Sequence, residues 1–362
     1  MTILTFTLYD FCETFHFKTS EDALYMSKLQ QVSALAGVSK ATVSRVINNS
    51  ENVSQDARQK VLQAMKQLNF HIHDLKRTSE STAMIGIILP FGSTIRSHSF
   101  SIDILAGAEE KAFENDYMIL VGNSDNKVKE HELVTQMINR DVEGLVIWSS
   151  NPEPDPPHLQ FVEKSGVPFV MVDRKAGMEA HTVRGDHLLG SLNLIRHLIS
   201  LGHRHIAIVS PSTNPTYGER IRGYQLALME HGIAPAEEHQ VIAGETADLR
   251  EAIRRLLTGR PKLTALFVAS PGLLMPVVGL LDEMGLRVPE DISIVTFDDT
   301  YTPLPDKYKQ FFTSVIQSGK LIGSMAMELL FRQLRNPSPD KQEIVLPGSL
   351  HIRQSTGPAA AE

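Results

Sequence analysis

Apolar residues between positions 29 and 68 recur at helical spacing, in runs separated by short breaks. The first run places apolar residues three or four positions apart, at Leu29, Val32, Leu35 and Ala36. This spacing predicts a helix with one apolar face. Gly37 follows the run and is expected to end the helix, because glycine enters left-handed backbone space without a steric penalty.

The next run, residues 40–48, predicts a second short helix with two unlike faces. Ser39 precedes this helix and can cap it through its hydroxyl. One face is apolar and contains Val43, Val46 and Ile47. The opposite face is small, polar and basic and contains Ala41, Ser44, Arg45 and Asn48. Two short helices joined by a glycine turn, the second with such an outer face, are typical of a helix-turn-helix DNA-binding domain.

A third helix is expected after Ser54, a second capping residue. Its apolar residues at helical spacing are Ala57, Val61, Met65 and Leu68. Any small helical hairpin can show these spacings, so the pattern by itself leaves a purely structural role open.

From residue 83 onward, short apolar runs alternate with stretches of helical periodicity. The first series of runs is AMIGIILP, YMILVG, GLVIWSS and VPFVMVD, and the alternation restarts through HIAIVS, ALFVAS and DISIVTFDD. Strands separated by helices predict right-handed crossovers and parallel sheets. Continuous apolar runs agree, since both faces of such a sheet are covered. The body is too long for one such sheet, so we expect two similar α/β lobes.

Charge is distributed unevenly along the chain. The 362 residues are 42% hydrophobic and 21% charged, which is ordinary for a soluble globular protein. The formal net charge is -7, yet residues 28–78 hold eight Lys or Arg and three Asp or Glu, so this segment carries +5 and the remainder -12. A basic N-terminal segment on an acidic body attracts phosphate at one end only.

The single cysteine and the apolar runs exclude two further classes of protein. Cys12 is the only cysteine, which excludes an internal disulfide framework and suits a reducing cytoplasm. No apolar run approaches the length of a membrane span.

The string AGVSKATVSRVINNSENVSQDARQKVLQAM resembles the N-terminal DNA-binding domain of the LacI/GalR family of bacterial transcription regulators. Landmarks of the family's body follow in register: EGLVI, HLISLGHRHIAIV, ERIRGY, MGLRVPEDISIVTFDD and TSVIQ. The resemblance implies an all-α helix-turn-helix domain followed by a body similar to a periplasmic sugar-binding protein, with two parallel-sheet lobes and three chain crossings between them.

The resemblance also implies a division into domains. Family members usually begin a few residues before the first helix, so Met26 is a candidate start and the preceding extension is a candidate artefact or disordered arm. The expected segments are the extension 1–25, the DNA-binding domain 26–69, the linker 70–81, the N-terminal lobe 82–184 plus 316–338, the C-terminal lobe 185–315 plus 339–355, and the tail 356–362. In this scheme the C-terminal lobe takes both of the last strands, within Glu343–His351.

The DNA-binding residues expected from the resemblance lie on the second helix and in the linker. Lys40, Ala41 and Arg45 are the candidates for reading bases, and Ser39, Thr42, Ser44 and Asn48 for holding phosphates or positioning the helix. In the family the linker is a hinge that wedges a leucine into the minor groove. This chain lacks the usual proline, asparagine and wedge leucine; Arg77 fits the pattern and Leu75 is a substitute, so a plain flexible linker remains an alternative.

Four residues of the body are candidates for binding a small-molecule effector, a sugar or a related polar metabolite. Asp186 lies in GDHLLGS, where the family often has Asp-Asn-x-x-Gly-Gly, Arg220 is the arginine of RIRGY, and Asp298 is the first acid of FDD. The structural alternatives are a helix cap for Asp186, a surface ion pair for Arg220 and a turn for Asp298. Where the family has Asn-Asp after a strand, this chain has Ser270 and Pro271, so Ser270 is the remaining polar candidate and the pocket is altered or partly degenerate.

No enzyme signature, cofactor motif or metal motif is found in the sequence. The sequence therefore predicts a cytoplasmic, homodimeric, DNA-binding transcription regulator, a repressor that binds a near-palindromic double-stranded DNA operator and responds to a metabolite, with no membrane partner. A DNA binder with a degenerate, effector-independent pocket is one alternative, and a cytoplasmic sugar-binding protein is another.

Overall fold

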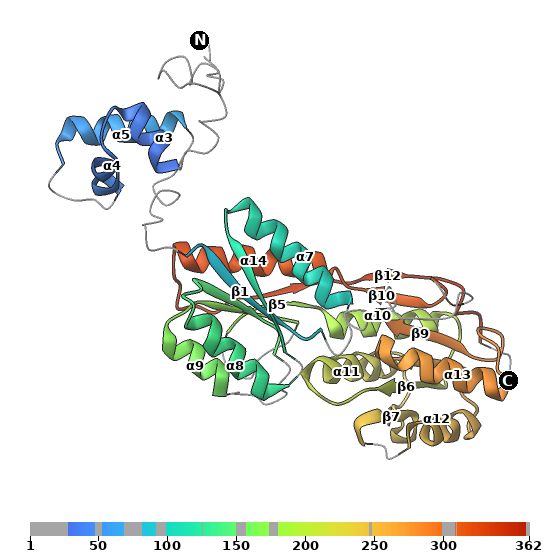
Figure 1. The fold of residues 1–362 in the computed structure, drawn as a ribbon. Helices are drawn as coiled ribbons and strands as arrows, with labels where there is room; N and C mark the ends of the chain where they lie inside the picture. The colour runs from blue at the N-terminus through green and yellow to red at the C-terminus, as the bar shows by residue number, and fades with distance from the viewer. Residues whose placement is uncertain are drawn as a thin grey trace, which may run out of the picture. The chain divides into compact units, whose positions relative to one another are not determined.

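The computed structural model describes residues 28–47, 53–68, 82–91, 99–124, 126–149, 157–173, 180–245, 248–298, 308 and 310–359. The chain divides into two compact units, residues 1–82 and 83–362 (Figure 1). The expected Leu75, Arg77, Asn48 and the segment 1–25 lie outside the described residues, as does the side chain of Ser44.

The first unit contains three helices, α3 (Lys28–Ala36), α4 (Lys40–Ile47) and α5 (Gln55–Gln67). Gly37 has a φ of +63°, the left-handed conformation expected for the residue that ends the first helix. The shared core consists of Val32, Ala36, Val43, Val46, Val61, Ala64 and Met65. Ala57 and Leu68 are only half-buried, because they lie at the two ends of α5.

The N-terminal lobe is built on a six-stranded sheet of order β11-β5-β4-β3-β1-β2, with every pairing parallel. Its strands are β1 (Met84–Leu89), β2 (Met118–Asn123), β3 (Gly144–Ile147), β4 (Phe169–Val172), β5 (His181–Gly185) and β11 (Glu343–Leu346). Helices α7 (Ser99–Glu114) and α14 (Gly319–Arg335) pack on one face, and α8 (Lys127–Ile138) and α9 (Pro157–Ser165) pack on the other (Figure 1).

The C-terminal lobe repeats this plan with the order β12-β10-β9-β8-β6-β7, in which only β12 is antiparallel. Its strands are β6 (Ile206–Ser210), β7 (Gln240–Ile242), β8 (Ala265–Val268), β9 (Ser293–Phe297), β10 (Thr313–Ile316) and β12 (Ser349–His351). Helices α10 (His187–Ser200) and α11 (Pro215–Glu230) cover one face, and α12 (Leu249–Thr258) and α13 (Leu274–Met284) cover the other. Three single-turn 3-10 helices, η2 (Glu237–His239), η3 (Ala243–Glu245) and η4 (Pro271–Leu273), complete the described elements.

The last two strands divide between the lobes, which corrects one expectation from the sequence. Both strands were expected in the C-terminal lobe, but β11 pairs in parallel with β5 of the N-terminal lobe, and only β12 pairs with β10. The third crossing therefore lies between Leu346 and Ser349, next to the crossings that follow β5 and β10. Strand partners far apart in the sequence decided this assignment, and no local pattern encodes them.

Candidate functional site

The outer face of α4 is exposed as the sequence predicts. Lys40, Ala41 and Arg45 are exposed, while Val43 and Val46 are buried against the other two helices. A helix with a basic, polar outer face, whose apolar face is packed on neighbouring helices, can enter the major groove of DNA.

Ser39 and Thr42 have a structural role at the start of α4. The hydroxyl of Ser39 accepts the backbone N–H of Thr42 at 3.1 Å and lies 2.9 Å from the hydroxyl of Thr42. This cap satisfies one of the free N–H groups at the helix start and fixes the direction of α4. The two residues thus position the helix, which is one of the two roles predicted for them.

In the body, Arg220 is the centre of a buried polar cluster on α11. The helix begins at Asn214, whose side chain accepts the N–H of Tyr217 at 3.1 Å, and this start directs Arg220 inward, where it is only 5% exposed. Its Nη1 donates to the carbonyl of Ala269 at 2.6 Å, and its guanidinium carbon lies 3.8 Å from the centre of the Phe297 ring. A buried guanidinium held by a carbonyl and an aromatic face is rigid, as a ligand-binding donor requires.

Asp298 lies beside this arginine at the carboxyl end of β9. Its Oδ2 is 3.7 Å from Nη2 of Arg220, and its two oxygens accept from Gln317, Oδ1 from the backbone N–H at 3.0 Å and Oδ2 from Nε2 at 2.7 Å. Burial raises the pKa of the Asp298 carboxyl, whereas Arg220 and the hydrogen bonds from Gln317 oppose the rise. With a φ of +53°, Asp298 also has a left-handed backbone conformation, which is uncommon for a residue with a Cβ.

His187 and Asp173 extend the cluster toward the N-terminal lobe, and the sequence did not single out either residue. Nδ1 of His187 lies 3.2 Å from Nη2 of Arg220 and accepts from Nε at 3.4 Å, so the proton of the neutral imidazole belongs on Nε2. Nε2 in turn lies 3.5 Å from Oδ1 of Asp173, at the end of β4. One feature of the sequence could have pointed to His187: it lies at the position where the family often has asparagine.

Asp173 and Asp298 occupy equivalent positions in the two lobes. Each follows the fourth strand of its lobe in chain order, β4 or β9, and each has a left-handed φ, +62° and +53°. Each also donates its N–H to a carbonyl of the neighbouring strand, at Val183 and Val315. Backbone strain of this kind persists where the surroundings enforce it. The two acids therefore flank Arg220 and His187 from opposite lobes.

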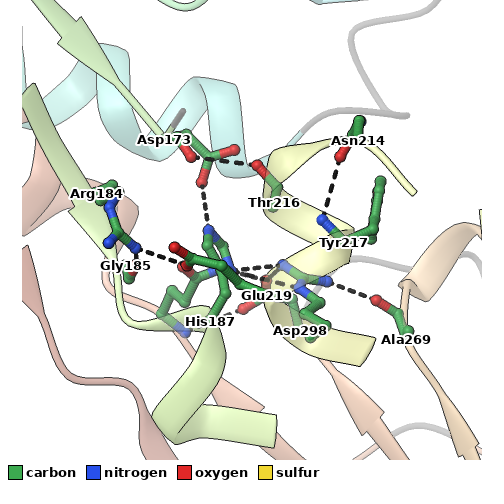
Figure 2. Close-up of polar contacts among 12 residues, drawn as sticks. Asp173, Arg184, Gly185, His187, Asn214, Thr216, Tyr217, Glu219, Ala269 and Asp298 are labelled. Carbon is green, nitrogen blue, oxygen red and sulfur yellow. Dashed lines mark hydrogen bonds and ion pairs between the residues drawn. The ribbon is translucent and has the colours of Figure 1, made fainter. Parts of the chain in front are cut away.

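The first turns of α11 also contact the N-terminal lobe directly (Figure 2). Thr216 donates to the carbonyl of Asp173 at 3.5 Å, and Glu219 accepts from Arg184 of β5 at 2.8 Å. Glu219 and Arg220 follow Thr216 by three and four residues, so both lie next to it on the helix surface. Movement of Arg220 would therefore change two contacts between the lobes, Thr216 with Asp173 and Glu219 with Arg184.

The other two predicted residues are each next in sequence to a residue that contacts this arginine, Asp186 before His187 and Ser270 after Ala269, and their own recorded hydrogen bonds go elsewhere. Asp186 caps α10, with Oδ1 accepting the N–H of Leu189 at 2.8 Å, which is its structural alternative. Ser270 accepts from the hydroxyl of Tyr217 at 3.4 Å, one turn before Arg220. Of the four effector candidates, the structure brings Arg220 and Asp298 together.

Within the described residues, no group of three or more His, Cys, Asp or Glu side chains is arranged to hold a metal ion. In the same part of the chain, no helix combines the length and the apolar character that a membrane crossing needs.

Two family profiles match the chain: “Bacterial regulatory proteins, lacI family” over residues 28–72 and “Periplasmic binding protein-like domain” over residues 195–356. The chain is 32% identical over 336 residues to catabolite control protein A of Priestia megaterium, covering 91% of this chain and 98% of that protein. It is 31% identical over 343 residues to the transcriptional repressor PurR of Haemophilus influenzae, with 91% and 98% covered.

Two solved structures share the fold and more than nine-tenths of the chain. One is the complex of the transcriptional regulator CelR with cellobiose, at 26% identity and a TM-score of 0.66, covering 91% of this chain and 100% of that one. The other is the lac repressor dimer bound to operator and the anti-inducer ONPF, at 25% identity and a TM-score of 0.62, covering 91% and 99%.

Proposed function

The chain belongs to the lacI family of bacterial regulatory proteins, and on that premise we propose that it represses transcription as a homodimer under the control of a small polar metabolite. It is a DNA-binding transcription regulator and not an enzyme, as the family and its relatives are. DNA binding also agrees with a cytoplasmic location, and the lac repressor dimer on its operator supports the dimer.

We assign operator recognition to the exposed face of α4. Arg45 and Lys40 are long, exposed cations suited to guanine edges, and Ala41 suits contact with a thymine methyl. Ser39, Thr42, Ser44 and Asn48 orient the helix or hold phosphates, and Leu75 and Arg77 of the linker would contact the minor groove. Two such domains related by a two-fold axis would bind a near-palindromic site.

The observation that carries effector binding is the buried Arg220 between His187 and Asp298. Its fixed planar donors and the neighbouring carboxylate acceptor match the alternating donor and acceptor pattern of sugar hydroxyls. The related CelR was solved with cellobiose, which supports a sugar or a similar polar metabolite here. Ligands of parallel sheets bind beyond the carboxyl ends of the strands, where these side chains lie. Ser270 would add one hydrogen bond, and Asp186 would act as a helix cap near the site.

Coupling to DNA would follow from the lobe contacts of α11. A ligand that binds one lobe arrangement more tightly shifts the population toward that arrangement. Because Arg220 lies next to Thr216 and Glu219 on α11, a ligand on Arg220 changes the contacts that hold the lobes together.

The proposal is tested in two steps. The full chain is first offered a random pool of DNA duplexes, and binding of the selected duplex is measured against salt concentration. A basic domain on phosphates predicts tight, salt-sensitive, sequence-selective binding. The thermal midpoint is then recorded with cellobiose, other neutral sugars and nucleosides, for wild type and Arg220→Ala. A ligand that stabilises wild type but not the variant supports the effector site, whereas failure to select any duplex rejects the function.

A second candidate function is DNA binding without an effector. It is favoured by the sequence Ser270-Pro271 in place of Asn-Asp and by the contact that Tyr217 already makes with Ser270. Selection of a duplex together with no stabilisation by any compound of the panel would favour this alternative.

A further inference from the structure

Ala83, the first residue of the second unit, has an uncommon backbone conformation. Its φ is +52°, in the left-handed region that residues with a Cβ rarely adopt. Such a conformation persists only where neighbouring groups hold it, and it clusters at positions where geometry matters for function. Ala83 lies immediately before β1, so its backbone conformation sets the direction in which the chain enters the first strand of the second unit.

Both backbone groups of Ala83 are held by the body. Its N–H donates to Oε1 of Glu143 at 2.9 Å, and its carbonyl accepts the N–H of Met118 at 2.8 Å. Glu143 is itself fixed, because its backbone N–H donates to Met84 at 2.9 Å and its Oε2 accepts the hydroxyl of Tyr117 at 2.8 Å. A hydrogen bond to a carboxylate is stronger than one to a neutral acceptor.

Tyr117 is held in turn by α14. Its ring centre lies 4.9 Å from that of Phe331, which is 3% exposed. Near its start, helix α14 packs closely on α7, since a Cβ added at Gly107 would collide with the backbone carbonyl of Lys320, and one added at Gly323 with that of Ile104. The junction at Ala83 is therefore connected, through Glu143, Tyr117 and Phe331, to helix α14 and its packing on α7.

The other end of α14 begins at the effector site proposed above. Ser318 caps the helix, accepting the N–H of Leu321 at 3.2 Å, and the residue before it, Gln317, holds the carboxylate of Asp298. With 17 residues, α14 is about 25 Å long and connects the two locations as one element.

We propose that Glu143 and Tyr117 are positioning residues that hold the linker junction at Ala83 in one direction, so that the two DNA-binding domains of a dimer meet both halves of an operator at once. The proposal rests on the proposed function, because it requires a dimeric operator. It assigns these residues no contact with DNA and no part in the affinity of a single domain for a half-site.

The test compares one full operator with one half-site for each variant. The DNA is the duplex that the wild-type chain selects from a random pool, and its half-site is the same duplex with one half scrambled. Loss of two hydrogen bonds in Glu143→Ala should weaken binding to the full duplex about tenfold or more and leave half-site binding unchanged. Tyr117→Phe, which removes one hydroxyl, should show a smaller loss in the same direction.

Two further variants make the result specific. Glu143→Gln keeps an acceptor for Ala83 and should restore most of the full-site affinity. Glu114→Gln, the matched control, removes an exposed carboxylate that pairs with Lys111 of α7 rather than with Ala83, and should bind as wild type does. Amide hydrogen exchange at Ala83 should rise in Glu143→Ala and Tyr117→Phe only.

Equal full-site binding by Glu143→Ala, Tyr117→Phe and wild type would overturn the proposal. So would an equal loss on both duplexes, which would mark a general structural defect. If the wild type itself shows no preference for the full duplex, the dimeric operator of the proposed function has failed instead.

Discussion

His187 accepts a hydrogen bond from Arg220 inside the body, with Nδ1 3.4 Å from Nε and 3.2 Å from Nη2. Both side chains are nearly inaccessible, at 1% and 5% exposure. The imidazole therefore faces a permanent cation with its lone pair, and Nε2 faces Asp173. This arrangement contributes to the fixed orientation of the guanidinium, because His187 contacts Nε and Nη2 while Nη1 donates to Ala269.

Two replacements of His187 should show how much of its contribution to stability comes from accepting a hydrogen bond and how much from filling space. His187→Leu removes the acceptor of the Nε–H of a buried guanidinium and should lower the free energy of unfolding by about 1–3 kcal/mol. His187→Asn retains an acceptor and should cost less. Urea denaturation of both variants measures the difference; equal losses would show that the contact with Arg220 contributes nothing.

Gly185→Ala should weaken effector binding, although Gly185 ends β5 of the N-terminal lobe, where the chain crosses to the C-terminal lobe. A Cβ at this residue would collide with Oε1 of Gln317, the side chain that holds Asp298. Displacing the Gln317 side chain removes the hydrogen bond to Oδ2 of Asp298, so the ligand-induced rise in the thermal midpoint should shrink. Gly279→Ala on α13 has open space around the new Cβ and serves as the control, with an unchanged response expected. Identical ligand responses in both variants would rule out this role for Gln317.

Stability should decrease at acidic pH through His203 and His197. Burial lowers the pKa of both imidazoles, and they hold the last described residues, His203 through the carbonyl of Gly357 at 3.0 Å and His197 through Thr356 at 3.0 Å. Since the folded pKa lies below the unfolded value of about 6.5, the unfolded chain binds more protons, and the stabilisation is fully present above that pH and falls below it.

Urea denaturation at pH 7.5 and 5.5 measures this pH dependence. The double variant His197→Gln/His203→Gln should lose less stability between the two pH values than wild type does. An equally steep loss in the variant would assign the pH dependence to other groups.

Arg45→Ala should abolish specific operator binding without unfolding the domain. The side chain is exposed, so its removal leaves the core of the three helices intact, and loss of a base contact costs about 1–3 kcal/mol of discrimination. Lys66→Ala, an exposed cation on α5, is the control and should reduce affinity without changing sequence preference. Unchanged selectivity of Arg45→Ala in a competition assay would contradict the assignment of α4 as the reading helix.

Much of the local structure was predictable because its causes are local. The turn at Gly37, the caps at Ser39, Ser54 and Asp186, and the alternation of strands and helices all follow from spacing and side-chain chemistry within a few residues. The sequence also named Arg220 and Asp298 as candidates for effector binding, although only the structure shows them 3.7 Å apart.

What the sequence alone determined is therefore the element order, the fold class and the basic, exposed face of α4. The tertiary structure decided the rest: that β11 joins the N-terminal sheet, that Asp173 and His187 complete the surroundings of Arg220, and that Glu143 holds Ala83 from 60 positions away. Each of these contacts joins segments distant in the chain, and their partners are selected by the packing of whole helices on sheets. Local periodicity carries no information on that choice, because it records only which side of an element is apolar.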